Sequence, residues 1–337
     1  MKDKIRFAVI GTNFISDWVI AGARQDSRFE LKAVYSRTQA TADAFAAKHA
    51  IPFTFTSLEE MAKSDEIDAV YIASPNSLHA IQSILMMQHG KHVLCEKPFA
   101  SNAREAFQMI QEAEKAGVTL MEAMKPTLTP NFSAIIDQLP SIGKVRHYVS
   151  SFCQYSSRYD RFRAGEQLNA FNPQLSSGAL VDVGVYTLYP LVVMFGKPLR
   201  IQASGTLLST GVDGAGSLLL DYPDFQATLV YSKISDAYMP TEIQGEEGTI
   251  SVDKIHTIRE VKFYPRKFAT SGIGTGSEPI LISRSTPNDE YFYEIKEFID
   301  LIQTGNQQSK INSWKSSLIT MEVMDEIRHQ LKVRFIE

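Results

Sequence analysis

Cysteine is scarce in this chain, which excludes a disulfide framework. The only two, Cys95 and Cys153, lie in apolar, strand-like surroundings outside any CxxC or histidine-spaced pattern. We therefore predict two reduced core thiols and no metal site. No run of 18 apolar residues occurs, and residues 1–20 lack a charged segment followed by an uninterrupted apolar one. The sequence thus predicts a cytoplasmic protein with no membrane partner.

An excess of positive charge is also missing. The chain carries 34 Lys and Arg against 38 Asp and Glu, giving a net charge of −4 and a pI near 6.0. No basic cluster occurs, so nothing favours nucleic acid or an anionic membrane as a partner. With 337 residues, 44% hydrophobic and 21% charged, the composition is that of a soluble protein with two domains, each able to bury a core.

The first third of the chain alternates strand-like and helical segments. Apolar strands are expected at Ile5–Ile10, Leu31–Tyr35, Asp68–Ala73, Lys91–Glu96 and Val118–Glu122, with a helix at Asn102–Gly117. This alternation predicts an α/β Rossmann domain with a mainly parallel sheet, in which ligands bind at the carboxyl ends of the strands. The residues that follow such ends are Asn13, Arg37, Asn76 and Lys97.

The first strand runs into Gly11, Thr12, Asn13, Phe14 and Ile15. A strand, a glycine turn and a helix are typical of a dinucleotide-binding site, in which three glycines allow a tight turn, a close approach of the pyrophosphate and close helix packing. Only the first glycine is present. We expect Asn13 to replace the second, because asparagine enters left-handed conformations readily, and Ser16 to replace the third because it is small.

The second strand ends in Ser36, Arg37 and Thr38. NAD-selective enzymes place a carboxylate here to accept hydrogen bonds from the ribose 2′-hydroxyl, and this chain has none. A hydroxyl and a forked guanidinium suit a 2′-phosphate. The segment therefore predicts NADP(H) in preference to NAD(H); the alternative is an ordinary polar loop.

Glu96, Lys97 and Pro98 follow the fourth strand. Proline biases the preceding residue toward an extended conformation, so Lys97 is expected to end the strand in a fixed pose, as a candidate catalytic residue. Alone, the tripeptide is equally compatible with a polar strand exit, and sequence does not decide whether the bond before Pro98 is cis.

The pattern changes after residue 123. Strands are expected near 145–154, 199–208, 216–222, 225–233, 240–253 and 259–264, hairpin turns at 223–224 and 245–248, and helices near 290–304 and 313–331. We predict a Rossmann domain at 1–123 and, at 124–337, an α+β domain with an open, mostly antiparallel sheet. One sheet face without covering helices predicts a homodimer or homotetramer, with Leu218–Leu220 and Ala227–Val230 as candidate contact strands.

A second catalytic candidate lies between Ser176 and Tyr186. Asp182 and Tyr186 are four residues apart and would share one face of a helix. Asp182 is the only acid in an apolar stretch, where it requires a hydrogen-bonding partner or a function. Two interpretations stay open: a helix cap with a core tyrosine, or a catalytic pair.

Taken together, these motifs resemble the glucose-fructose oxidoreductase, inositol dehydrogenase and MocA family of NAD(P)-dependent oxidoreductases over essentially the whole chain. The resemblance assigns the turn at Gly11–Ile15 and a second loop to the cofactor, Glu96–Pro98 to the catalytic lysine motif and Gly178–Tyr186 to the substrate side. The second loop contains Ser74, Pro75, Asn76 and His79. Tyr186, where many members have histidine, resembles the branch with dimeric dihydrodiol dehydrogenase and NADP-dependent xylose dehydrogenase.

What the resemblance implies is hydride transfer between the nicotinamide and a carbinol or carbonyl carbon of a sugar, inositol or vicinal diol. Tyr186 would be the acid/base, Lys97 its electrostatic partner and ribose anchor beside the nicotinamide, and Asp182 an acceptor for a substrate hydroxyl; Lys97 as the acid/base stays open. Arg161 and Lys125 are further substrate candidates, Lys125 either in the pocket or on its rim. The alternative is a non-catalytic NADP-binding regulator of the same fold.

Overall fold

The computed structural model describes residues 3–266 and 277–335, which form two compact units. The first unit contains residues 1–125 and 288–321, and the second contains residues 126–287 and 322–337. The main change of unit thus lies two residues after the expected boundary at 123/124. The larger difference is that a segment near the C-terminus, expected in the second domain, belongs to the first unit.

The sheet of the first unit is six-stranded and entirely parallel, with the strand order β3-β2-β1-β4-β5-β6. Its strands are β1 (Ile5–Ile10), β2 (Phe29–Tyr35), β3 (Phe53–Phe55), β4 (Ala69–Ile72), β5 (His92–Glu96) and β6 (Leu120–Ala123). Its helices are α1 (Phe14–Ala23), α2 (Gln39–His49), α3 (Leu58–Lys63), α4 (His79–Gln88) and α5 (Ala103–Ala116). The predicted parallel sheet is confirmed; the three-residue β3 is too short for a recognisable strand pattern.

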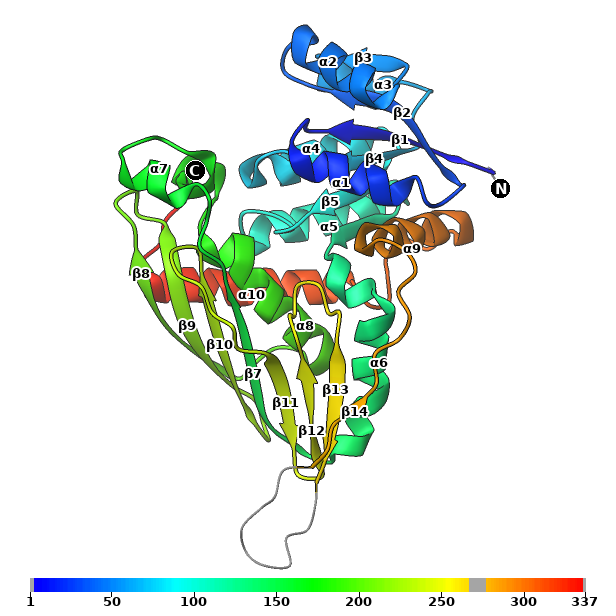
Figure 1. Ribbon diagram of the computed structural model, residues 1–337. Helices are drawn as coiled ribbons and strands as arrows, with labels where there is room; N and C mark the ends of the chain where they lie inside the picture. The colour runs from blue at the N-terminus through cyan, green and yellow to red at the C-terminus, as the bar shows by residue number, and fades with distance from the viewer. Residues whose placement is uncertain (1–2, 267–276, 336–337) are drawn as a thin grey trace, which may run out of the picture. The chain divides into compact units, whose positions relative to one another are not determined.

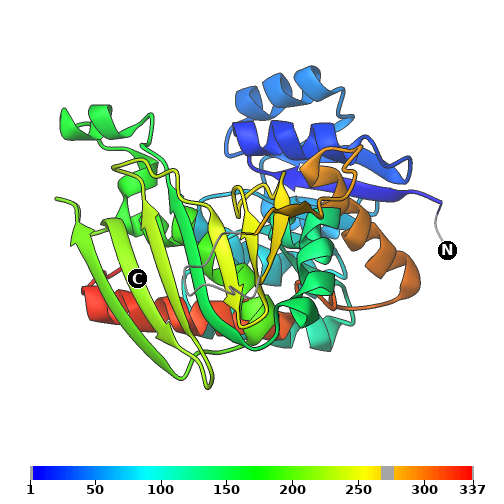
Figure 2. The ribbon, with the colours of Figure 1, turned by 60° about the horizontal axis from the view of Figure 1, so that its bottom comes forward.

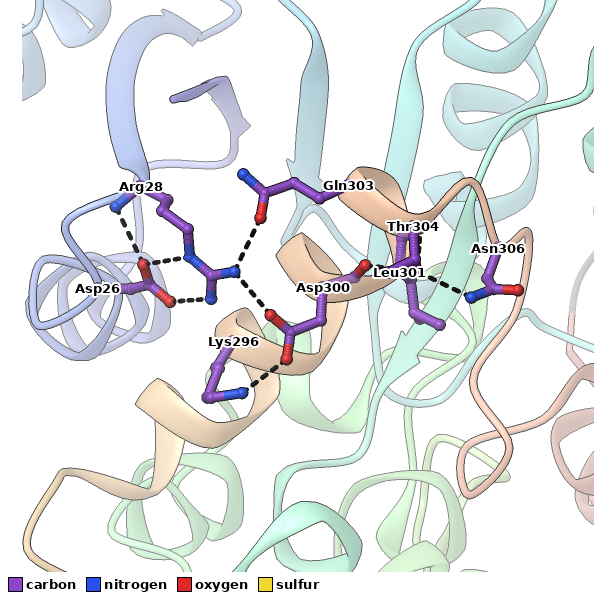
Figure 3. Close-up of polar contacts among 8 residues, drawn as sticks. All are labelled: Asp26, Arg28, Lys296, Asp300, Leu301, Gln303, Thr304 and Asn306. Carbon is purple, nitrogen blue, oxygen red and sulfur yellow. Dashed lines mark hydrogen bonds and ion pairs between the residues drawn. The ribbon is translucent and has the colours of Figure 1, made fainter. Parts of the chain in front are cut away.

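Helix α9 (Glu290–Thr304) packs against α1 in this unit (Figure 1). The Phe7 and Phe298 rings lie 5.9 Å apart, which extends the core beneath β1. In the same C-terminal half of the helix, Arg28 Nη1 donates to Asp300 Oδ1 at 2.7 Å and to Gln303 Oε1 at 2.9 Å (Figure 3). Asp26 accepts from the remaining nitrogens of the same guanidinium. Apolar packing and a shared arginine therefore fix α9 to the first sheet.

The start of α10 (Trp314–Leu331) is held to β6 by two buried donors. The Trp314 indole donates to the Leu120 carbonyl at 2.8 Å, and the Asn312 amide donates to the carbonyls of Glu122 and Met124 at 3.2 and 3.1 Å. These contacts explain the difference from the expected domain boundary. An amphipathic pattern shows that a helix has a buried face but not which sheet will cover it.

The second unit is built on an eight-stranded sheet with the order β14-β13-β12-β11-β7-β10-β9-β8. Its strands are β7 (Val145–Cys153), β8 (Arg200–Leu207), β9 (Asp213–Asp221), β10 (Gln226–Ser232), β11 (Thr241–Gly245), β12 (Gly248–Val252), β13 (Val261–Pro265) and β14 (Ile280–Leu281). Among the described strands of this sheet, only the β7–β10 pair is parallel. The mostly antiparallel sheet and both hairpins, β9–β10 and β11–β12, are confirmed.

Helix α8 (Val185–Phe195) packs against β7 and β10, and α6 (Pro130–Gln138) packs against β13. Leu218 and Leu220 are buried on the helix side, whereas Leu219 between them is 47% exposed. Figure 2 shows the green strands of this sheet with no helix drawn in front of them. The helical run 173–195 is long and apolar enough to cross a membrane, but 72% of its apolar window is buried, as in a core helix.

Candidate active site

Gly11 forms the tight turn between β1 and α1. Its φ is +110°, and a Cβ atom here would lie 2.5 Å from the Ala73 carbonyl oxygen at the end of β4. A side chain is therefore excluded by both the backbone conformation and the space. The turn brings the N-terminus of α1 to the carboxyl end of the parallel sheet, the usual position for a dinucleotide pyrophosphate.

Asn13 has a different role from the expected one. Its φ is −91° and its backbone is extended, so the predicted left-handed conformation is wrong. The side chain caps α1 instead: Oδ1 accepts from the amides of Ile15 and Ser16, and Nδ2 donates to the Ala73 carbonyl at 3.0 Å. Capping explains why asparagine serves here without a second glycine. Ser16 is fully buried and donates to the Gly11 carbonyl at 2.8 Å.

Ser36, Arg37 and Thr38 follow β2 at the same edge of the sheet. Thr38 caps α2 by accepting from the Thr41 amide, which fixes the turn. Arg37 is exposed, so its guanidinium is accessible to a phosphate. The segment offers hydroxyls and a cation, as the sequence indicates.

His79 connects the second predicted cofactor loop to the lysine motif. It is 1% exposed, with Nδ1 2.9 Å from the Pro98 carbonyl oxygen and Nε2 3.0 Å from the Ser74 carbonyl oxygen. Burial lowers the pKa of His79 against the opposing effect of the two carbonyls. A neutral imidazole has one N–H and donates to one carbonyl at a time. The loop with Ser74 is thereby held next to Pro98, the residue that follows the cis Lys97–Pro98 peptide bond.

Pro75 and Asn76 complete this loop: Pro75 is exposed, and Asn76 begins a short 3₁₀ turn before α4. Lys97 is partly exposed at the end of β5. All these side chains lie at the carboxyl edge of the sheet, within the first unit.

Two buried carboxyl groups, those of Glu122 and Glu294, lie near Glu96, the residue before Lys97. Tyr71 Oη donates to Glu96 Oε1 at 2.5 Å, and the Lys97 amide donates to Glu96 Oε2 at 3.2 Å. Desolvation raises the pKa of Glu96 and, more strongly, that of Glu294, which is 1% exposed. It also raises the pKa of Glu122 to about 7. Sequence reasoning missed Glu122 and Glu294; for Glu122 a signal existed, an acid within an apolar strand.

Lys125 is buried, not on a rim. Its ammonium donates to Glu290 and lies 4.5 Å from the centroid of the Tyr291 ring. The lysine is therefore engaged within the first unit by α9. Its predicted role toward substrate stays a prediction.

Asp182 and Tyr186 share one face of a helical segment of the second unit, residues 180–195. Residues 180–184 form a π-helical turn that continues into α8. Between 180 and 192, these two are the only residues that are not buried. The stretch is thus buried on all sides except the face that presents the acid and the phenol together.

Asp182 is neither isolated nor a helix cap. Its side chain is 45% exposed and accepts from the buried Lys233, a residue that sequence reasoning missed. The helix start is capped by Asp213, which accepts from the Leu180 amide at 2.6 Å. Gly178, with φ +153°, allows Asp213 this close approach, because a Cβ atom at Gly178 would collide with Asp213 Oδ1.

An aromatic group surrounds Tyr186. The Phe152 and His256 rings stack 3.8 Å apart, and Tyr186 meets them edge-on at 5.7 and 6.3 Å. The remaining substrate candidate, Arg161, lies on α7 (Tyr159–Arg163), where it is exposed and forms an ion pair with Glu166. Within residues 3–266 and 277–335, no group of three or more His, Cys, Asp or Glu side chains is placed to hold a metal ion.

The residues at the first sheet edge suit a dinucleotide. Gly11 brings the backbone against β4, α1 starts at the turn, and Arg37 offers an exposed cation where an adenosine 2′-phosphate would lie. In a bound complex, Gly11 to Ile15 would contact the pyrophosphate, Ser36 to Thr38 the adenosine ribose, and Ser74 to Asn76 with Lys97 the nicotinamide half.

Comparison with known proteins places both units in one family. Residues 5–124 match the family described as "Oxidoreductase family, NAD-binding Rossmann fold", and residues 139–251 match "GFO/IDH/MocA C-terminal domain". The chain is 50% identical over 329 residues to scyllo-inositol 2-dehydrogenase (NADP(+)) IolU of Bacillus subtilis (strain 168), covering 98% of each protein. It is 32% identical to trans-1,2-dihydrobenzene-1,2-diol dehydrogenase of Danio rerio, covering 90% of this chain and 89% of that one.

A solved structure shares the whole fold at low identity. Aldose-aldose oxidoreductase from Caulobacter crescentus, complexed with glycerol, superimposes with a TM-score of 0.81 at 20% identity, covering 98% of each chain. The resemblance inferred from the motifs is confirmed by these matches. The chain belongs to the Gfo/Idh/MocA family of NAD(P)-dependent oxidoreductases.

Proposed function

We propose that this protein is an NADP(H)-dependent oxidoreductase that interconverts a carbinol and a carbonyl on a neutral polyol, with inositols and vicinal diols as the first candidates. The observation that carries the proposal is the paired presentation of Asp182 and Tyr186 on the one open face of a buried helical segment. Support comes from the 50% identical relative, whose name gives both scyllo-inositol and NADP(+).

The bound nicotinamide would supply the hydride acceptor or donor. Tyr186 would move the proton of the reacting hydroxyl, because a positioned phenol can act as acid and base in turn. Lys97 would hold the nicotinamide ribose; that its charge also favours the ionised phenol stays a prediction from the sequence. Asp182 would accept a hydrogen bond from a second substrate hydroxyl and so select compounds with neighbouring hydroxyl groups. The reverse assignment, with Lys97 moving the proton, stays open.

The aromatic rings of Phe152 and His256 support this role for Tyr186. The edge-on contacts with these two rings restrict rotation of the Tyr186 ring, whose only polar atom is the hydroxyl oxygen. A restricted phenol loses little freedom when substrate binds, which favours a productive geometry.

The test is a spectroscopic assay of NADPH formation with scyllo-inositol, myo-inositol, aldoses and vicinal diols, each also offered with NAD. We expect turnover with at least one polyol and NADP. The Tyr186→Phe variant keeps the ring and removes the titrating group, so turnover should fall by roughly 10²-fold or more, while NADPH affinity stays within about twofold. Near-normal turnover of this variant would transfer the acid/base role to Lys97. Tight NADPH binding without turnover on any polyol would contradict the proposal.

We also propose a homodimer or homotetramer formed through the outer face of the second sheet. Leu219 is 47% exposed there, and Val230 on the neighbouring strand is partly exposed. Of the other candidates, Leu218, Leu220, Ala227 and Leu229 are buried within the unit and cannot contribute, whereas Thr228, which pairs with Leu219, is partly exposed. A cytoplasmic location stays a prediction.

A further inference from the structure

The second unit contains a buried lysine that the proposed reaction does not yet use. Lys233 follows β10 and is 6% exposed. An ammonium taken out of water requires a charged partner. The partner in the structure is Asp182, whose Oδ2 accepts from Lys233 Nζ. One member of the pair is enclosed and the other is open, since the side chains are 8% and 45% exposed.

The backbone of Lys233 is fixed from both sides. Its amide donates to the Gly214 carbonyl at 2.9 Å, and its own carbonyl accepts from the Ser156 amide at 2.9 Å. The lysine thus joins β9 to the segment that follows β7. These two hydrogen bonds fix the backbone position from which the Lys233 side chain extends.

The side chain of Lys233 is guided by an aromatic ring. Its Nζ lies 5.4 Å from the centroid of the Phe171 ring, within the range of a cation–π contact. Phe171 is 1% exposed, and the Phe162 ring of α7 packs on it at 4.8 Å. The ammonium is therefore placed by packing on one side and by Asp182 on the other.

We infer that Lys233 is a positioning residue that orients the Asp182 carboxylate toward the substrate hydroxyl. The inference rests on the proposed function. The terminal torsion of an aspartate is broad, so a hydrogen-bond donor on one oxygen narrows the orientations open to a half-exposed carboxylate. A donor on Oδ2 fixes the plane of the group, and the pair as a whole carries no net charge. Such a face favours neutral hydroxylated compounds over anionic ones.

The expected effect of removing the ammonium is a loss in substrate use, not in cofactor binding. Lys233→Met keeps the length and apolar body of the side chain. We expect kcat/KM for the polyol to fall about tenfold, mainly through KM, because a misoriented acceptor weakens binding of the hydroxyl. NADPH affinity should be unchanged, because the cofactor residues lie in the first unit. Lys233→Arg, which retains the cation, should recover most of the loss.

A double-mutant cycle separates positioning from general damage. If Lys233 acts through Asp182, then Asp182→Asn with Lys233→Met should have the same kcat/KM as Asp182→Asn alone. The control is Lys197→Met, which removes another ion pair of the second unit. Lys197 pairs with Glu322, and its side chain is 55% exposed. It should leave kcat/KM unaltered. Should Lys233→Met fail to fold, the arginine variant and the double variant, in which no unpaired charge remains, give the decision.

Effects that multiply in the double variant, or an unaltered kcat/KM in Lys233→Met, would overturn the inference while the proposed function stands. Absence of turnover on every polyol by the unmodified protein would overturn both.

Discussion

Glu122 makes the stability of the first unit depend on pH in a direction that can be measured. Its side chain is enclosed in β6, where desolvation raises the pKa from 4.5 to about 7, and Ser317 and the Phe99 backbone only partly oppose this. Below pH 4.5 the carboxyl is protonated in both folded and unfolded chains and has no effect. Between pH 4.5 and 7 the unfolded chain releases the proton and the folded chain keeps it, so the free energy of unfolding decreases.

The size of the effect follows from the two pKa values. A difference of about 2.5 units at 1.36 kcal/mol per unit gives about 3 kcal/mol. We expect Glu122→Gln, which does not titrate, to remove this loss. Relative to the variant, the unmodified protein should lose about 3 kcal/mol of unfolding free energy between pH 4.5 and 7. Above pH 7 the two curves of unfolding free energy against pH should run parallel.

Urea unfolding at several pH values, followed by tryptophan fluorescence, measures the difference. Trp314 reports on this region because its indole donates to the Leu120 carbonyl of β6. The pH dependence of the difference is the readout, since the amide of glutamine adds a cost that does not vary with pH. Glu114→Gln on the exposed side of α5 is the matched control and should show a constant difference. Parallel curves for Glu122→Gln from pH 4.5 to 8, or a gain of stability by the unmodified protein, would refute the reasoning.

Three further predictions concern the turn, the cofactor and the assembly. Gly11→Ala should destabilise the first unit by on the order of 2 kcal/mol and weaken NADPH binding, whereas Gly90→Ala, also at positive φ but with nothing within 4 Å, should cost less in urea unfolding; equal losses would count against the contact with Ala73. Arg37→Asp should weaken NADPH binding about tenfold or more relative to NADH in fluorescence titrations, and stronger NADH binding by the unmodified protein would remove the claim. Light scattering after size exclusion should give a multiple of 37.7 kDa, and Leu219→Lys on the outer sheet face should lower it; a monomer at micromolar concentration would reject the interface.

The longer strands were predictable because their patterns are local, whereas the short β3 and β14 were not expected. Ile5–Ile10 is an apolar run that ends in a glycine, and its bounds in the sequence and in the structure are the same. The π-helical turn at Leu180–Gly184 was not predictable, because its sequence reads as the first turn of an ordinary helix. The expected shared face of Asp182 and Tyr186 nevertheless holds, since four residues are close to one turn in either geometry.

The hydrogen-bond and ion-pair partners of the site residues could not be predicted for a different reason. Lys233 and Asp182 are 51 residues apart, and their ion pair exists only because β10 ends beside the π-helical turn. Asn13 illustrates the same limit: asparagine suits both a left-handed turn and a helix cap, and the carbonyl of Ala73, 60 residues away at the end of β4, favours the cap. Residue type indicates the possible roles, and tertiary neighbours choose among them.

Because residues 288–321 belong to the first unit, they affect how the chain folds during synthesis and which fragments can fold alone. On a ribosome, the first unit cannot complete its folding until residue 321 has been synthesised, 321 − 125 = 196 residues after the end of its first segment. At 5 to 20 residues per second the wait is roughly 10 to 40 s, during which the Phe7 side of the sheet lacks its partner Phe298. A fragment ending at residue 125 should therefore aggregate. A fusion that joins residues 1–125 to 288–321 through a short linker is the smallest version of this half expected to fold alone.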